Sequence, residues 1–80
     1  MKFCAELLGN LGRGVGGRLC VELEECKDVE EVVEELLRRA GAAARPDELM
    51  VIDEGGRALD GGKTTCEVSS VRVARLYRGG

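Results

Sequence analysis

The segment "DVEEVVEELLRRAG", residues 28–41, decides the fold. Its apolar residues recur with the spacing of one face of an α-helix: Val29, Val32, Val33, Leu36, Leu37 and Ala40. Asp28 stands where an N-cap belongs, and Glu31 follows three residues later, as in a variant of the capping box. Gly41 stands where a left-handed residue commonly ends a helix. The segment therefore predicts one amphipathic helix with a single buried face.

The charges along this helix favour the same interpretation. Acidic residues lie in its first turn and Arg38 and Arg39 in its last, which suits the helix dipole. Glu34 with Arg38 and Glu35 with Arg39 are spaced four residues apart, so we expect two ion pairs on the exposed face.

Two alternating segments precede the helix. "MKFCAELL" (1–8) turns Phe3, Ala5 and Leu7 to one side, and "RLCVELE" (18–24) alternates in the same way. Between them, "GNLGRGVGG" (9–17) is rich in glycine, which is typical of a turn or flexible loop. The sequence thus predicts a hairpin.

After the helix, the chain returns to the sheet. Pro46 prevents the helix from continuing, "LMVID" (49–53) reads as a short strand, and "RAL" (57–59) allows a brief one. In "SVRVARLY" (70–77), Val71 and Val73 alternate with Arg72 and Ala74. The order ββαββ predicts an α+β domain, with one helix on a mixed four- to five-stranded sheet. The domain would span residues 1–78 with its last strand central, and a flexible diglycine tail, residues 79–80, would project from it.

Composition narrows the function. The chain has 80 residues, which suffice for one domain, and its net charge of −3 disfavours nucleic acid. No apolar run approaches the roughly 20 residues needed to span a bilayer, and no signal peptide is recognisable, so we expect a cytoplasmic protein without a membrane partner. There is no histidine, the commonest general base and a common zinc ligand. We therefore expect a protein that is not an enzyme and holds no metal or cofactor. We also expect a monomer, because nothing in the sequence suggests an obligate dimer.

Four cysteines leave two interpretations open: Cys4, Cys20, Cys26 and Cys66. Their spacing contains no CxxC, so neither a zinc ribbon nor a thioredoxin-type site fits. As free thiols they would act as small apolar side chains. Disulfides are the other interpretation, although these are rare in the cytosol outside hyperthermophiles.

The predicted hairpin indicates that one pair of cysteines is close enough to form a disulfide. If Phe3 lies opposite Val21, then Cys4 lies opposite Cys20 on the face away from the core. Cross-strand neighbours are about 4.5–5.5 Å apart at Cβ, near enough for small shifts to close a disulfide.

The order of elements resembles ubiquitin and its β-grasp relatives, which include the small archaeal modifier proteins and the sulphur carriers of molybdopterin and thiamine synthesis. "MKFCAELLG" is similar to the family's first strand and the segment 28–41 to its helix. "RPDELMVID" resembles the proline-aspartate turn and third strand, and "RALDGGKT" the short strand and "DG-x-T" loop with one extra residue. "SSVRVARLYRGG" resembles the last strand and its Arg-Gly-Gly tail. The resemblance implies a β-grasp fold, in which Cys26 and Cys66 would also be neighbours.

The resemblance implies that an activating enzyme uses ATP to adenylate the carboxylate of Gly80. Glycine suits this chemistry because Gly79 and Gly80 let the backbone enter a narrow tunnel without side-chain hindrance. The acyl group would then be conjugated to lysines of target proteins, or would accept sulphur for a sulphur-acceptor enzyme. Arg78 and Arg75 would dock acidic groups of the activating enzyme, although both also fit a solvated strand end.

Ubiquitin binds receptors through a patch centred on an exposed isoleucine of its third strand. Alignment on Leu59 places Asp53 at that position, with Leu8, Ala74 and Val51 as the surrounding docking residues. A charge at the centre of such a patch costs affinity unless it is paired, so we expect no binding to ubiquitin's usual receptors.

Three functions therefore remain in view. The basic end "RLYRGG" favours a protein modifier, with a second role as sulphur carrier left open. A dedicated sulphur carrier for molybdopterin, thiamine or tRNA thiolation is the first alternative. The second is a non-covalent binding module that uses the exposed sheet face around Leu8, Val51 and Ala74.

Overall fold

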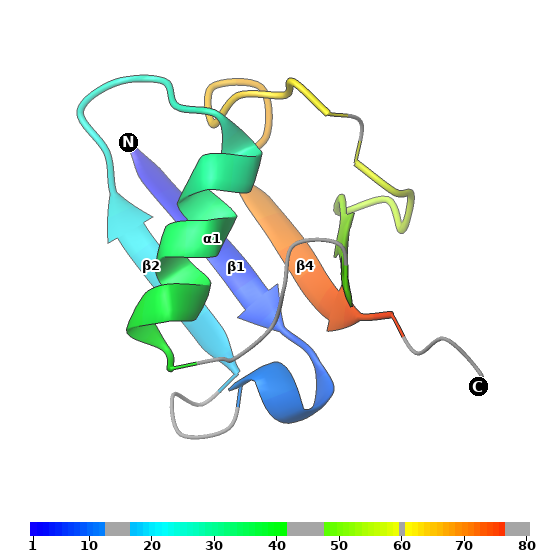
Figure 1. Ribbon diagram of the computed structural model, residues 1–80. Helices are drawn as coiled ribbons and strands as arrows, with labels where there is room; N and C mark the ends of the chain where they lie inside the picture. The colour runs from blue at the N-terminus through cyan, green and yellow to red at the C-terminus, as the bar shows by residue number, and fades with distance from the viewer. Residues whose placement is uncertain (13–16, 42–47, 60, 77–80) are drawn as a thin grey trace.

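One helix packs on one face of a four-stranded sheet in the computed structural model, which describes residues 1–12, 17–41, 48–59 and 61–76 (Figure 1). The elements are, in order, β1 (Lys2–Leu7), the 3-10 turn η1 (Gly9–Gly12), β2 (Arg18–Glu22), α1 (Val29–Arg39), β3 (Leu49–Ile52) and β4 (Ser70–Arg75). The strand order is β2-β1-β4-β3. No helix in these described ranges is long and apolar enough to cross a membrane.

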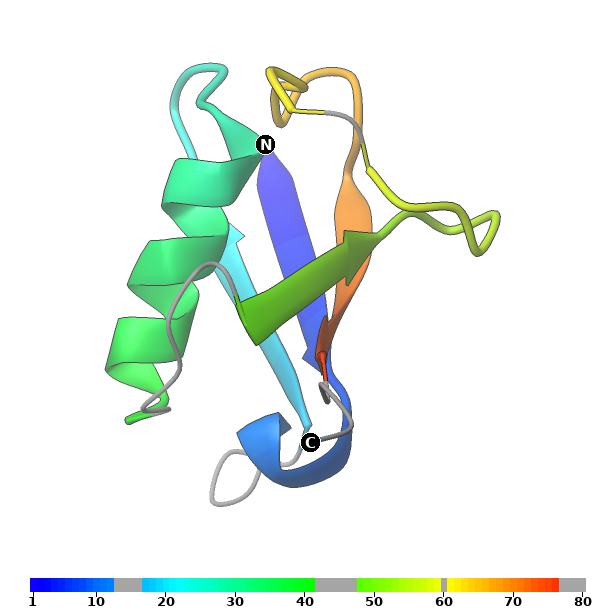
Figure 2. The same ribbon diagram turned by 45° about the vertical axis from the view of Figure 1, so that its right-hand side comes forward.

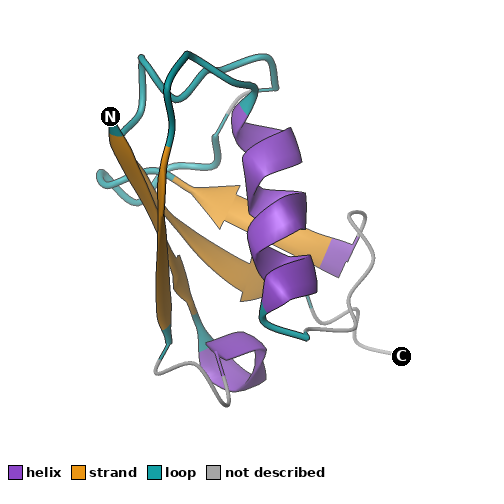
Figure 3. Ribbon diagram, turned by 90° about the vertical axis from the view of Figure 1, so that its left-hand side faces the viewer, coloured by secondary structure: helices purple, strands orange, loops and turns teal. Residues whose placement is uncertain are grey.

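The sheet is mixed, because β1 runs parallel to β4 while β1–β2 and β3–β4 are antiparallel pairs. Seen along the sheet, helix and strands form two layers (Figure 3). This arrangement confirms the predicted α+β class and is β-grasp-like. It also confirms that the last strand is central, since β4 lies between β1 and β3 (Figure 2).

The core lies between α1 and the two central strands. The five predicted helix residues from Val29 to Leu37 are all buried, and Ala40 is partly buried and packs against them. They meet the buried residues of β1 and β4: Phe3, Ala5, Leu7, Val71 and Val73. Aliphatic side chains thus supply nearly all of the core, and Phe3 is its one aromatic member among the described residues.

Both ends of α1 agree with the sequence. The Asp28 carboxylate accepts a hydrogen bond from the Glu31 backbone N–H at 3.2 Å, which satisfies one of the free donors of the first turn. Gly41 follows the helix with φ of 72°, a left-handed conformation that glycine adopts without steric cost.

The exposed ion pairs of α1 differ from the expectation. Glu35 bonds both arginines of the last turn, Arg38 at 2.6 Å and Arg39 at 3.2 Å. The Glu35–Arg39 pair is confirmed. The predicted Glu34–Arg38 pair is wrong, because Arg38 turns to the carboxylate three residues before it.

Two segments outside the main strands also differ. The glycine-rich segment after β1 begins with η1, whose Leu11 is buried in the core, so it is more ordered at its start than a simple loop. The predicted brief strand at 57–59 is reduced to a single bridge between Ile52 and Ala58, beside a hydrogen bond from Leu59 N–H to the Val51 carbonyl.

Candidate functional site

The described chain ends just beyond β4. Strand pairing continues to Arg75, opposite Leu49, and the Leu76 N–H donates to the Glu48 carbonyl at 2.6 Å. The Leu76 side chain is 43% exposed. Three predicted site residues, Arg78, Gly79 and Gly80, lie outside the described residues together with Tyr77. Backbone hydrogen bonds therefore hold the chain in place as far as Leu76.

Arg75 lies on the helix-facing side of the sheet. It follows Val73 by two residues and shares that side with Leu49, because directly opposed residues of an antiparallel pair share a face. The side chain is partly buried. Arg75 is thus not a fully solvated strand end, one of the two interpretations that the sequence left open.

The predicted docking residues do not form one patch. Val51 lies opposite Val73 and packs against the core, so it belongs to the helix-facing side. Ala74 lies opposite Met50 on the other face. Leu8 is partly buried after β1, with its N–H bonded to the Val73 carbonyl at 2.9 Å. Placing Val51 on an exposed face with Ala74 is therefore wrong. Because β3 is apolar at every position, its sequence does not indicate which residues face inward.

Asp53, at the expected centre of the patch, organises the turn after β3. One carboxylate oxygen accepts from the N–H of Gly55 at 2.9 Å and from that of Arg57 at 3.0 Å. Side chain-to-backbone bonds of this kind are what make aspartate common in turns. The charge at this position thus has a structural role that the sequence comparison did not reveal.

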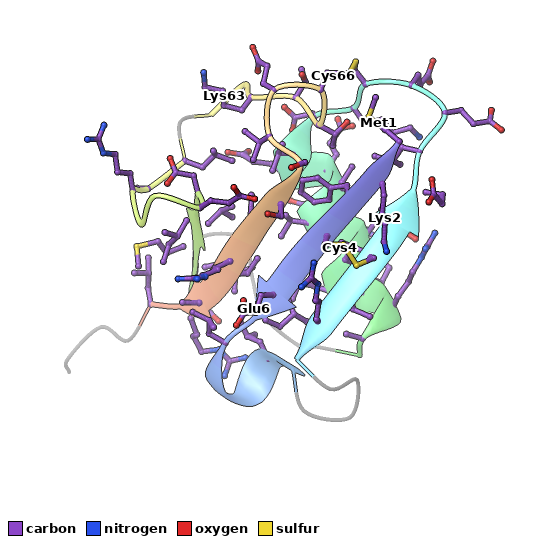
Figure 4. The ribbon with its side chains drawn as sticks, turned by 180° about the vertical axis from the view of Figure 1, so that it is seen from behind. Met1, Lys2, Cys4, Glu6, Lys63 and Cys66 are labelled. Atoms are coloured by element: carbon purple, nitrogen blue, oxygen red, sulfur yellow. A yellow bond between two sulfur atoms is a disulfide. The ribbon has the colours of Figure 1, made fainter. Side chains whose placement is uncertain are left out.

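The outer face of the sheet, turned away from α1, is polar and crosslinked over β1 and β2 (Figure 4). The hairpin register sets Cys4 opposite Cys20, as predicted, and the two form a disulfide. Close by, Glu6 pairs with Arg72 at 3.7 Å. Ser70 Oγ donates to a Glu54 carboxylate oxygen. The apolar positions of this face, Met50, Ile52 and Ala74, are thus confined to β3 and the end of β4.

A second disulfide links Cys26, just before α1, to Cys66 in the loop before β4. Between the same two segments, Thr65 N–H donates to the Lys27 carbonyl at 2.8 Å, and Lys27 N–H donates to Thr65 Oγ1 at 3.0 Å. Of the two interpretations that the sequence left open, the structure has all four cysteines in disulfides. The proximity implied by the family resemblance is confirmed.

The sequence did not single out a groove of about 300 Å³ between α1 and β3. It is lined mainly by apolar residues: Val33, Leu49, Met50, Val51, Ala58, Leu59 and Leu76. Two exposed carboxylates of α1, Glu30 and Glu34, border it. Glu30 and Glu34 are four residues apart and therefore neighbours on the helix surface, next to the buried Val33. This spacing was the one signal in the sequence that the helix has an acidic edge here.

A comparable groove of about 340 Å³ lies between α1 and β2. Its apolar residues are Val21, Leu23, Val32 and Leu36, and its charged residues are two acidic and two basic: Glu31, Glu35, Lys27 and Arg39. This groove is at the opposite edge of the sheet from β3.

Within the described ranges, no group of three or more acidic, cysteine or histidine side chains is placed to hold a metal ion. The features that distinguish the described structure are the hydrogen-bonded end of β4, the two grooves beside α1 and the disulfide on the outer face of the sheet. No protein-family model matches this chain, and neither does any curated protein.

Proposed function

We propose that this chain is a ubiquitin-like protein modifier that is activated at the carboxylate of Gly80. The single observation that carries the proposal is the central position of β4. Hydrogen bonding to β1 on one side and β3 on the other fixes this strand in a β-grasp-like sheet. The diglycine tail, residues 79–80, would thus follow a strand whose position is fixed.

The proposed chemistry is an acyl transfer. The Gly80 carboxylate attacks the α-phosphate of ATP in the activating enzyme, pyrophosphate leaves, and an acyl adenylate forms. A thiol of the conjugating machinery displaces AMP, and the amine of a target lysine then displaces the thiol to give an isopeptide bond. This chain contributes the carboxylate and its access, because residues 79 and 80 carry no side chains.

Arg75 and Arg78 are the residues that we propose contact acidic groups of the activating enzyme. Guanidinium groups suit this role because they bind carboxylates through two parallel hydrogen bonds. Since adenylation consumes ATP, the proposal also places the protein in the cytoplasm. Two disulfides in that compartment are typical of intracellular proteins from hyperthermophiles.

A dedicated sulphur carrier would use the same acyl adenylate. Hydrosulphide (HS⁻) would displace AMP to give a Gly80 thiocarboxylate, and no isopeptide bond would form. A non-covalent binding module is less favoured, because Val51 packs against the core and the outer sheet face is charged and crosslinked over β1 and β2.

The test is to incubate the chain with ATP, a sulphide source and a cell extract of the source organism, which supplies the adenylating enzyme, the conjugating machinery and the target proteins, followed by intact-mass analysis. A series of higher-mass conjugates supports the modifier, and a mass gain of one sulphur-for-oxygen exchange supports the carrier. The control lacks Gly79 and Gly80. If wild type gives neither product, or if the truncated chain reacts equally, the proposal fails. The mass of the protein isolated from its cells tests whether Gly80 is the final residue.

A further inference from the structure

We infer that the adenylating enzyme occupies the groove between α1 and β3 with an apolar side chain flanked by lysine or arginine. This inference rests on the proposed function, since it assumes that an enzyme takes hold of the tail. It assigns a partner to a surface that does not overlap the docking residues predicted from the sequence, apart from Val51.

The reach of the tail supports the position. Four residues follow Leu76, and a fully extended chain covers at most about 3.6 Å per residue, so the Gly80 carboxylate lies within about 14 Å of Leu76. An enzyme that encloses this carboxylate must therefore come within about 14 Å of Leu76. Leu76 itself lines the α1–β3 groove, so the groove lies where the chain comes out of β4.

The lining supports an apolar side chain as the occupant. Leu49, Val51 and Leu59 are partly buried against the core, and Leu76 adds a half-exposed edge. A concave apolar surface with a few charged groups at its border is typical of the sites that receive an anchoring side chain at protein interfaces. Filling the groove would remove this apolar surface from water.

The charges at the border of the groove determine which residues of the partner can flank its apolar side chain. Glu30 and Glu34 are exposed and border the groove, and no basic side chain is among the described residues that line it. A partner with lysine or arginine at this edge would be attracted, and one with aspartate or glutamate would be repelled. In the α1–β2 groove, by contrast, acidic and basic residues balance and Arg39 is already paired with Glu35. That groove is also separated from β4 by β1, and so lies farther from the tail.

The experiment compares two charge-reversed double variants in ATP–pyrophosphate exchange with the adenylating enzyme from the source organism. The test variant is Glu30→Lys/Glu34→Lys. The control is Glu24→Lys/Glu31→Lys, which changes the net charge equally at exposed positions that do not line the α1–β3 groove. Thermal unfolding followed by circular dichroism verifies that both variants are folded.

We expect the test variant to raise the KM for this chain about tenfold, equivalent to about 1.4 kcal/mol of binding, with kcat unchanged. The control should stay near wild type. The KM of wild type should also increase with salt, and that of the test variant should increase less, because two attractive charge contacts have been lost.

Equal KM values for wild type, test variant and control would overturn the inference while leaving the proposed function intact. A lower KM for the test variant would overturn it too, because the groove would then be holding the chain's own basic tail. If wild type supports no exchange at all, the proposed function fails and the inference fails with it.

Discussion

Cys4 and Cys20 lie directly opposite each other in the β1–β2 hairpin, with their Cα atoms 4.0 Å apart. The flanking backbone bonds run from Leu7 N–H to the Gly17 carbonyl and from Leu23 N–H to the Met1 carbonyl. Odd-numbered residues of β2 therefore make the ladder bonds, and the cysteines form a non-hydrogen-bonded pair, in which opposed residues approach most closely. This spacing is what brings the two sulphur atoms within bonding distance.

Removing this crosslink should destabilise the domain. Cys4→Ala/Cys20→Ala opens a loop of sequence separation 16, and disulfides closing loops of this length contribute about 3 kcal/mol. Unfolding in guanidinium chloride measures the loss. An unchanged midpoint for the double variant would contradict the prediction.

The second crosslink provides a matched comparison. Cys26→Ala/Cys66→Ala opens a longer loop, of sequence separation 40, so the chain-entropy argument predicts an equal or larger loss.

Alkylation of the wild-type protein with and without reductant, followed by mass measurement, gives the number of disulfides directly. Four labelled cysteines without reductant would show that neither bond exists in the isolated protein.

Thr65→Val should cost about 1–3 kcal/mol. Thr65 is 4% exposed, and its hydroxyl accepts from Lys27 N–H, so valine would keep the shape but leave a partly buried donor without its acceptor. Thr65→Ser keeps the hydroxyl and is the control. Chemical denaturation of both variants tests this, and a valine variant as stable as the serine variant would contradict it.

Asp28→Ala should lower the free energy of unfolding by about 1 kcal/mol, because the Glu31 N–H loses its capping acceptor. Asp28→Asn should retain most of that stability, since asparagine is an equally good N-cap. Thermal or urea unfolding distinguishes the two variants. Equal losses would show that the charge of Asp28 matters and the cap does not.

Gly80→Ala should reduce kcat/KM for adenylation about 100-fold, because a methyl group next to the reacting carboxylate displaces it within a narrow active site. ATP–pyrophosphate exchange is the measurement. Ser69→Ala is the control, since it removes one atom from an exposed side chain that precedes β4, at the end of the strand opposite to Leu76. Adenylation of Gly80→Ala at the wild-type rate would contradict the proposed mechanism.

The sequence predicted most where periodicity and burial coincide. The spacing of apolar residues predicted the buried face of α1 from Val29 to Leu37. Alternation of apolar and polar residues predicted the register that pairs Phe3 with Val21. Both predictions are confirmed. The Asp28 cap was equally predictable, because it depends on residues close in sequence. These features need no knowledge of how distant segments pack.

Features that depend on tertiary packing were missed. All four residues of β3 are apolar and partly buried, so the pattern did not show that Val51 faces the helix. The α1–β3 groove joins Glu30 to Leu76, two residues far apart in sequence. The turn bonds of Asp53 were obscured by an alignment that treated the residue as part of a surface patch.

The parallel pairing of β1 with β4 also sets the order in which this sheet is completed during synthesis. Cys4 through Leu7 pair with Ser70 through Val73, so the innermost ladder joins the first and the last strand of the sheet in sequence order. Contacts between such distant segments slow folding, because a long loop must close before they form. A nascent chain that has not yet reached β4 would hold a hairpin and a helix with their apolar faces incompletely covered. An adenylating enzyme acting on the tail would consequently meet only chains whose sheet has had the chance to close.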